Sequence, residues 1–341
     1  MDPNGKSHQP PSRVAFVLIL IVTWCVLVQG TGVVSPFEPL HRVVPDQKTC
    51  PGLYCGRTVI QDDAGNITYS ACGACGRGER PNNSSICTPC EWAPDLYDWM
   101  YLGFMVLLSL TLHIFFIDYF SDGKSKVITL HISAALECCI ASIITLLVLD
   151  PMGTPQLRSC QVLQLSDWYT MLKNPQPQYS TTLHCTQEAV FPLYTAVFIY
   201  YSIHLLLMMI VRPALSVKLS DNLGRSSIYA ALYFIPILTV AHAVLAGLIY
   251  YSYPYLTLII SLVTHAVHFA KEEIETPKLL VSKKRNLIIL FSHWLIHAYG
   301  IVALTTLENP VIYGPMLAFI PAPAVFYIVT AQFTHPSRLH V

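Results

Sequence analysis

Long apolar runs alternate with shorter polar connections from residue 99 to near the end of the chain. We predict seven membrane-spanning helices, at 99–117, 127–149, 191–211, 228–250, 255–270, 287–306 and 312–331. A helix of about 20 apolar residues crosses a hydrocarbon core of about 30 Å, and only 255–270 falls clearly short of that length. The pattern therefore predicts an all-α polytopic membrane protein, occupying 99–332, with a lipid bilayer as its surroundings.

The composition is typical of a membrane protein and argues against nucleic acid as a partner. Of all residues 53% are hydrophobic and 12% are charged, against about a quarter charged in soluble domains. Basic and acidic residues balance at 20 each, so the formal net charge is zero. A balanced charge supplies no electrostatic attraction for nucleic acid, and we expect none as a partner.

The N-terminal part predicts a secretory route. Residues 1–30 have a weakly basic lead followed by the apolar stretch 14–28, which is typical of a signal peptide; an uncleaved signal anchor is the alternative. We expect 31–98 to form a small Cys-rich lumenal domain and 333–341 a cytosolic tail.

Cysteine usage indicates an oxidising compartment for 31–98. Six of the 11 cysteines follow the spacing C-x4-C-x16-C-x2-C-x11-C-x2-C. We predict disulfides here, with a zinc ribbon as the alternative, and leave the connectivity open. Two further cysteines lie in the connection 150–190, in the same compartment, where they could pair with each other. The disulfide candidates are Cys50, Cys55, Cys72, Cys75, Cys87, Cys90, Cys160 and Cys185.

Glycosylation acceptors lie in the same Cys-rich segment. Asn66, Asn82 and Asn83 each begin an Asn-x-Ser/Thr triplet. Because such acceptors are modified in the secretory lumen, they place 31–98 on the lumenal side.

The distribution of basic residues predicts the same orientation. With a lumenal start, the connections after spans one, three and five and the tail are cytosolic, and they contain most basic residues of the membrane part. Five lie in one segment, KEEIETPKLLVSKKR at 271–285. The others are Lys124, Lys126, Arg212, Lys218, Arg225 and Arg338, whereas the lumenal connections contain Arg158 and Lys173. Since basic residues accumulate on the cytosolic side, we expect a lumenal N-terminus and a cytosolic C-terminus.

Ionisable residues inside the predicted spans are the candidates for chemistry. Glu137 lies in the middle of span two, where an unpaired charge is costly, so we expect it to be protonated or bonded to a facing helix. His265 and His268, and also His293 and His297, can share helix faces. Such a cluster resembles that of seven-span intramembrane zinc hydrolases, but the remaining Ser/His/Asp elements of those enzymes have no counterparts at matching spans. The hydrolase is the alternative function.

Two further motifs carry less weight. Asn309-Pro-Val-Ile-Tyr313 matches the N-P-x-x-Y signature of G-protein-coupled receptors but lies at the lumenal start of span seven, so we interpret it as a turn and helix start. Residues 283–289, KKRNLII, fit a kinase-docking pattern of bases followed by apolar residues. Its apolar half begins span six, which argues against docking.

Long runs of the chain resemble one family. CPGLYCGR, CGACGRG, PDLYDWMYLGFM, ITLLVLDPMG, LSDWYTMLKNP, LHCTQEAVFPLYTAVFIYYS, SIYAALYFIPILTV, FSHWLIHAYG and FTHPSR are together similar to the c-Jun N-terminal kinase-associated membrane protein family. The resemblance implies a seven-span protein of the endoplasmic reticulum membrane and carries no catalytic residues.

The resemblance also implies a function. It indicates a non-enzymatic adaptor that brings the proteasome and membrane RING ubiquitin ligases to misfolded proteins and modulates c-Jun N-terminal kinase, with no cofactor. For such an adaptor the cytosolic lysines are candidate ubiquitin acceptors, among them Lys124, Lys126, Lys218 and Lys283.

Overall fold

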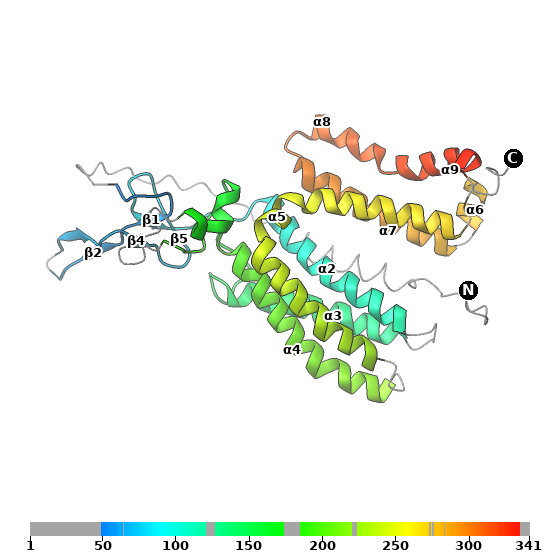
Figure 1. Ribbon diagram of the computed structural model, residues 1–341, viewed down its shortest axis with the longest axis horizontal. Helices are drawn as coiled ribbons and strands as arrows, with labels where there is room; N and C mark the ends of the chain where they lie inside the picture. The colour runs from blue at the N-terminus through cyan, green and yellow to red at the C-terminus, as the bar shows by residue number, and fades with distance from the viewer. Residues whose placement is uncertain are drawn as a thin grey trace.

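A computed structural model describes residues 49–63, 65–120, 127–173, 185–219, 224–272, 274, 276–282 and 284–334. Three predictions concern residues outside these ranges: the signal segment 1–30, the ubiquitin acceptors Lys124, Lys126 and Lys283, and the tail from residue 335 onward. Figure 1 shows a Cys-rich domain at one end of the long axis and helices at the other.

The Cys-rich domain consists of short strands in three two-stranded antiparallel sheets, which pair β1 with β4, β2 with β3, and β5 with β6. The strands are β1 (Cys55–Gly56), β2 (Val59–Gln61), β3 (Ile67–Tyr69), β4 (Gly73–Ala74), β5 (Glu79–Pro81) and β6 (Cys87–Pro89). Sheets this small cannot cover an apolar core, so covalent links must supply much of the stability.

Helices form most of the rest of the described chain. They are α2 (Leu96–Phe120), α3 (Val127–Val148), the 3-10 helix η1 (Leu165–Lys173), α4 (Leu193–Leu219), α5 (Arg225–Lys271), α6 (Pro277–Ser282), α7 (Lys284–Thr305), α8 (Pro310–Tyr313), the 3-10 helix η2 (Gly314–Phe319) and α9 (Ala322–Thr334). The prediction of a helical polytopic membrane protein with a Cys-rich N-terminal domain is confirmed.

The described residues contain fewer separate membrane-spanning candidates than the seven that the sequence predicts. Among the described residues, 6 segments are long and apolar enough to cross a membrane. One of them, Arg225–Ala270, has 46 residues and contains both expected spans 228–250 and 255–270. A straight helix of this length would measure about 70 Å, more than twice the hydrocarbon thickness. In Figure 1, however, α5 turns sharply near its middle.

The turn in α5 has an identifiable chemical cause at Pro254, which lies inside the helix. Proline has no N–H, so the carbonyl of Tyr250, four residues earlier, loses its helical partner. The hydroxyl of Tyr97, on α2, donates to this carbonyl at 2.6 Å. A side chain of a neighbouring helix therefore satisfies the group that the proline leaves free, as the membrane interior requires.

Contacts place the middle of α5 at the Cys-rich end and both of its ends away from that domain. Near the middle, a Cβ on Gly247 would lie only 2.8 Å from Cβ of Trp168 in η1, so the close approach requires glycine. At the first end, a Cβ on Gly224, the residue before α5, would lie 3.2 Å from Cδ2 of Leu130 near the start of α3. At the second end, Phe269 packs in a cluster with Leu290 and Ala324. The chain thus runs along the helical part twice within α5.

Two groups of helices result. The larger core joins α2, α3, α4 and the first half of α5, with Tyr101, Trp168 and Tyr250 packed edge to face or tilted near the Cys-rich end. The second half of α5 packs on α7 and α9. Asn309 caps α8, because its side chain accepts from Val311 N at 3.2 Å, which agrees with a helix start at this motif.

Candidate functional site

Two disulfides bond the Cys-rich domain to the connection between α3 and α4. Cys55 pairs with Cys185 and Cys90 with Cys160, across sequence separations of 130 and 70 residues. Cys50–Cys72 and Cys75–Cys87 close the domain internally. The suggested pairing of Cys160 with Cys185 is wrong, because each of them bonds to a cysteine that precedes α2. Sequence spacing could not show this connectivity.

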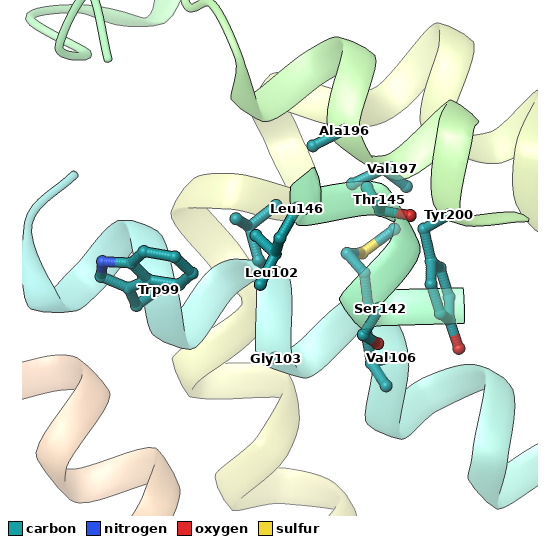
Figure 2. Close-up of a pocket in the computed structure, with 11 residues that line it drawn as sticks. Trp99, Leu102, Gly103, Val106, Ser142, Thr145, Leu146, Ala196, Val197 and Tyr200 are labelled. Atoms are coloured by element: carbon teal, nitrogen blue, oxygen red, sulfur yellow. The ribbon is translucent and has the colours of Figure 1, made fainter. Parts of the chain in front are cut away.

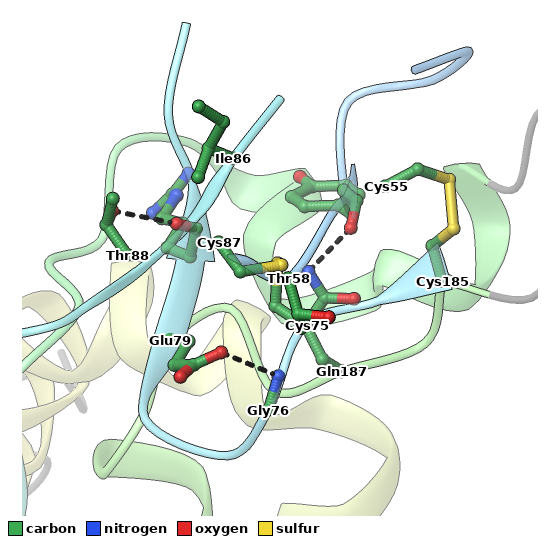
Figure 3. The surroundings of a disulfide bond; sticks show 12 residues. Cys55, Thr58, Cys75, Gly76, Glu79, Ile86, Cys87, Thr88, Cys185 and Gln187 are labelled. Atoms are coloured by element: carbon green, nitrogen blue, oxygen red, sulfur yellow. Dashed lines mark hydrogen bonds between the residues drawn. A yellow bond between two sulfur atoms is a disulfide. The ribbon is translucent and has the colours of Figure 1, made fainter. Parts of the chain in front are cut away.

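Figure 3 shows the surroundings of the Cys55–Cys185 bond. The side-chain amide of Gln187 donates to the carbonyl of Tyr54 at 2.6 Å, directly beside the disulfide. Gly56 packs against a second disulfide, Cys75–Cys87. A Cβ on Gly56 would lie only 2.6 Å from the Sγ atom of each of these cysteines. The sulfur atoms therefore form a dense core that substitutes for an apolar one.

A buried carboxylate holds the same two segments together. Asp167 in η1 accepts from the Tyr54 hydroxyl at 2.8 Å and from Arg80 Nη2 at 3.0 Å. Its second oxygen accepts from the backbone N–H groups of Leu163 and Gln164. Burial raises the pKa of Tyr54 to about 12, so its hydroxyl remains a donor at neutral pH. Because its partners come from both segments, Asp167 fixes the domain on the connecting loop.

The predicted glycan acceptors lie in turns of the Cys-rich domain. Asn66 follows the turn between β2 and β3 and is exposed. Asn82 and Asn83 are exposed between β5 and β6, and the side-chain oxygen of Asn82 accepts from the N–H groups of Ser84 and Ile86. These positions are open to a bulky modification, and glycosylation stays a prediction.

Inside the helical part, Glu137 is paired with a buried arginine. Arg212 on α4 contacts the carboxylate through Nη2–Oε2 at 2.8 Å and Nε–Oε1 at 3.2 Å. Ser133, one turn before Glu137 on α3, donates to Oε1 at 2.6 Å. The exposed fractions of Arg212 and Glu137 are 0% and 2%. The guanidinium places its positive charge against both carboxylate oxygens, which makes a charge tolerable at this depth.

This pairing corrects the assignment of Arg212 to a cytosolic connection. The residue lies inside α4, followed by Pro213, and its side chain is completely buried. The apolar neighbours on both sides, MMIVRPALSV, were the available signal that it belongs to a span. Lys218, one of the predicted ubiquitin acceptors, lies in the last turn of the same helix.

A histidine pair extends the ion pair to α2. Arg212 Nη1 lies 2.8 Å from His113 Nδ1, and His113 Nε2 lies 3.0 Å from His204 Nε2. An arginine can only donate, so His113 Nδ1 accepts and its proton is on Nε2. That proton is donated to His204, whose own proton is then on Nδ1. One arginine therefore sets both tautomers and joins three helices, α2, α3 and α4.

A thiol lies next to this network. Cys138 Sγ is 3.6 Å from His204 Nε2 and 4.0 Å from the Ser109 hydroxyl. Cys138 and His204 are each 0% exposed. Packed side chains surround the thiol on all sides, so the arrangement links helices and offers no room for a substrate.

The histidines of the alternative hydrolase function are arranged differently. The rings of His265 and His293 stack with centroids 5.3 Å apart, and Thr264 Oγ1 lies 3.2 Å from His293 Nδ1. Among the described residues, no three His, Cys, Asp or Glu side chains come together as a group that could hold a metal ion. A catalytic zinc needs three such ligands. The hydrolase is therefore not favoured.

The kinase-docking pattern at 283–289 is largely part of a helix. α7 begins at Lys284, and its membrane-spanning candidate begins at Asn286, which is 1% exposed. The apolar residues Leu287 and Ile289 therefore belong to a helix that crosses the membrane. They cannot fill the groove of a soluble kinase at the same time.

Comparisons with known proteins agree with this architecture. The family described as "JNK1/MAPK8-associated membrane protein" matches residues 50–336. The chain belongs to this family. Proteins of that name from Mus musculus and Homo sapiens are each 54% identical over 298 residues, covering 86% of this chain and 96% of the relative.

A less similar relative aligns over almost the same share of the chain. The "JNK1/MAPK8-associated membrane protein homolog" of Caenorhabditis elegans is 34% identical over 311 residues, covering 85% of this chain and 95% of the relative. No solved structure matches. The family match includes both the Cys-rich domain and the helices, so the chain is a multi-pass membrane protein of a family named for its association with the kinase JNK1.

Proposed function

We propose that the chain is an adaptor of the endoplasmic reticulum membrane that recruits proteasome and ubiquitin-ligase components to misfolded proteins and modulates stress-kinase signalling. The observation that supports it most is the separation of two ends. Four disulfides lie at one end of the molecule, which favours an oxidising lumen for that end. The segment 271–285, with five basic residues, begins at the last residue of α5 and continues the chain from there.

In this proposal the two ends have different tasks. The Cys-rich domain is lumenal, with acceptor sites at Asn66, Asn82 and Asn83, and it faces clients or stabilises the assembly there. The helix connections and tail face the cytosol, where the proteasome, a membrane RING ubiquitin ligase and c-Jun N-terminal kinase are available. The excess of basic residues in the helix connections and tail that are assigned to the cytosol supports this orientation.

The kinase arm of the proposal rests on the family relationship. The relatives carry association with JNK1 in their names. Because Leu287 and Ile289 belong to a membrane helix, binding would use the polar part of the connection before α7, and acidic patches on a partner would meet its bases.

A detergent pull-down from cells under folding stress tests the adaptor. The tagged full chain is expected to recover proteasome subunits, a RING ligase and the kinase. Neutralising Lys278, Lys283 and Lys284 to glutamine should reduce recovery, whereas Lys173→Gln, in an exposed position of η1, should not. Basic residues also orient membrane helices, so retained glycosylation of each variant must confirm unchanged topology. Recovery of none of the three partners by a stable, correctly oriented protein would overturn the proposal.

A further inference from the structure

A cavity opens among α2, α3 and α4, near the Cys-rich end of the helices. Figure 2 shows 11 residues around it. They include Leu102 and Val106 on α2, Thr145 and Leu146 on α3, and Ala196 on α4. All of these residues belong to helices that are long and apolar enough to cross a membrane.

Exposure of the lining side chains shows where the cavity opens. Trp99 and Leu102 on α2 and Ser142 on α3 are partly exposed. Every lining residue from α4, namely Ala196, Val197 and Tyr200, is buried. The mouth therefore lies between α2 and α3, and α4 forms the floor.

The end toward the Cys-rich domain is closed. Leu146 and Ala196, which line the cavity, also belong to a buried cluster with Leu149, Phe191 and the bonded pair Cys90–Cys160. This cluster separates the cavity from the aqueous side of the domain. A ligand would therefore reach it laterally, from the hydrocarbon of the bilayer.

The polar side chains of the lining are already engaged within the protein. The hydroxyl of Ser142 donates to the Cys138 carbonyl at 2.8 Å, and that of Thr145 to the Ala141 carbonyl at 2.7 Å. Tyr200 Oη lies 2.7 Å from the Ser109 hydroxyl. With its donors engaged and its other walls apolar, the cavity favours a hydrocarbon guest over a polar one.

We propose that this cavity binds one acyl chain of a membrane phospholipid, which enters between α2 and α3 and lies against α4. A flexible hydrocarbon chain can enter the space that side chains of three helices line. Trp99 lies at the rim, near the start of α2, where an indole meets the lipid headgroup region. The headgroup then stays at the interface while the chain fills the cavity.

Photo-crosslinking in vesicles tests the proposal. The full chain is reconstituted in phosphatidylcholine vesicles that contain a phosphatidylcholine with a diazirine in one acyl chain, and labelled peptides are mapped by mass spectrometry. Labelling is expected to concentrate on the peptides with Leu102–Val106 and Thr145–Leu146, above that of exposed positions in α5. Val106→Phe, which fills the cavity, should lower it several-fold. The matched control Val240→Phe, at a position that is 63% exposed, should leave it unchanged.

A second variant keeps the test decisive if Val106→Phe fails to fold. Ala196→Leu fills the floor of the cavity from α4 and should give the same selective loss, with thermal unfolding in detergent as the check of folding. Equal labelling of all lipid-facing helices, or labelling of the cavity by a photoactivatable sterol but not by the phospholipid, would overturn the proposal.

Discussion

Arg212 on α4 contacts both carboxylate oxygens of Glu137 on α3, with both side chains completely or almost completely buried. Removing one partner of a buried pair leaves the other charge without compensation. Replacing both partners by apolar residues avoids that cost, because neither charge then has to be desolvated. The pair thus couples the stability of two helices through one contact.

The first prediction concerns this coupling. Arg212→Met or Glu137→Leu should each lower the free energy of unfolding by roughly 3–5 kcal/mol. The double variant should lose clearly less than the sum of the two, measured by thermal unfolding of the purified protein. Arg225→Met, at an exposed position, is the control and should change little. Additive losses in the double variant would show that the two side chains do not interact.

The second prediction concerns the turn in α5. Tyr97→Phe removes the hydroxyl that donates to the Tyr250 carbonyl, and should cost about 1 kcal/mol of stability. Pro254→Ala restores an N–H at the position that can bond this carbonyl, so Tyr97→Phe should cost less in that background. Tyr255→Phe, at a position that is 53% exposed, should have little effect. An equal cost of Tyr97→Phe in both backgrounds would contradict the role of the hydroxyl.

The third prediction is a pH dependence at Glu188, just before α4. Burial raises the pKa of this carboxyl above its ordinary value of 4.5, although it accepts from Thr195 N at 2.8 Å. The folded state therefore binds the proton more tightly than the unfolded state. The resulting stabilisation is complete below pH 4.5 and is lost as the pH rises through the higher folded pKa.

Glu188→Gln tests this sign, because a neutral amide cannot titrate. The variant should show a flatter stability profile above pH 4.5 than the wild type, measured by thermal unfolding at a series of pH values. Glu91→Gln, at an exposed position, should keep the wild-type profile. A wild-type stability that instead rises with pH, with the difference lost in Glu188→Gln, would mean that the folded pKa is lowered.

The fourth prediction concerns the links between the Cys-rich domain and the connection that follows α3. Peptide mapping without reduction should recover Cys55 joined to Cys185 and Cys90 joined to Cys160. Cys55→Ser should lower stability by roughly 2–5 kcal/mol, because the bond closes a long loop in the unfolded chain. Cys139→Ser, at a cysteine outside the four disulfides, is the control and should change less than Cys55→Ser. Recovery of a peptide joining Cys160 to Cys185 would refute the assignment.

The class of fold could be predicted from the sequence, because apolar length determines what crosses a bilayer. The boundary between the fourth and fifth spans could not. Residues 251–254 contain no charge or glycine that would end a helix, so the chain continues helically and bends at Pro254. The donor that satisfies the carbonyl freed by this proline comes from another helix, at Tyr97, and no local pattern reveals it.

The candidate site shows the same limit. Glu137 could be singled out from its position alone, since a charge in a span needs a partner. Its partner, Arg212, is 75 residues away, and the usual accumulation of basic residues at cytosolic span ends predicts a different place for it. The cysteines could be recognised as bonded by their compartment, but which sulfur meets which is a property of the folded chain.

The two long-range disulfides also set an order of events during synthesis. Cys55 and Cys90 precede α2, whereas Cys160 and Cys185 follow α3. The first two thiols must therefore wait for their partners until both helices and the connection that follows them have been synthesised. A completed Cys-rich domain in this sense records that the chain has returned to it after α3, and a fragment that ends before residue 160 would retain two thiols without their native partners.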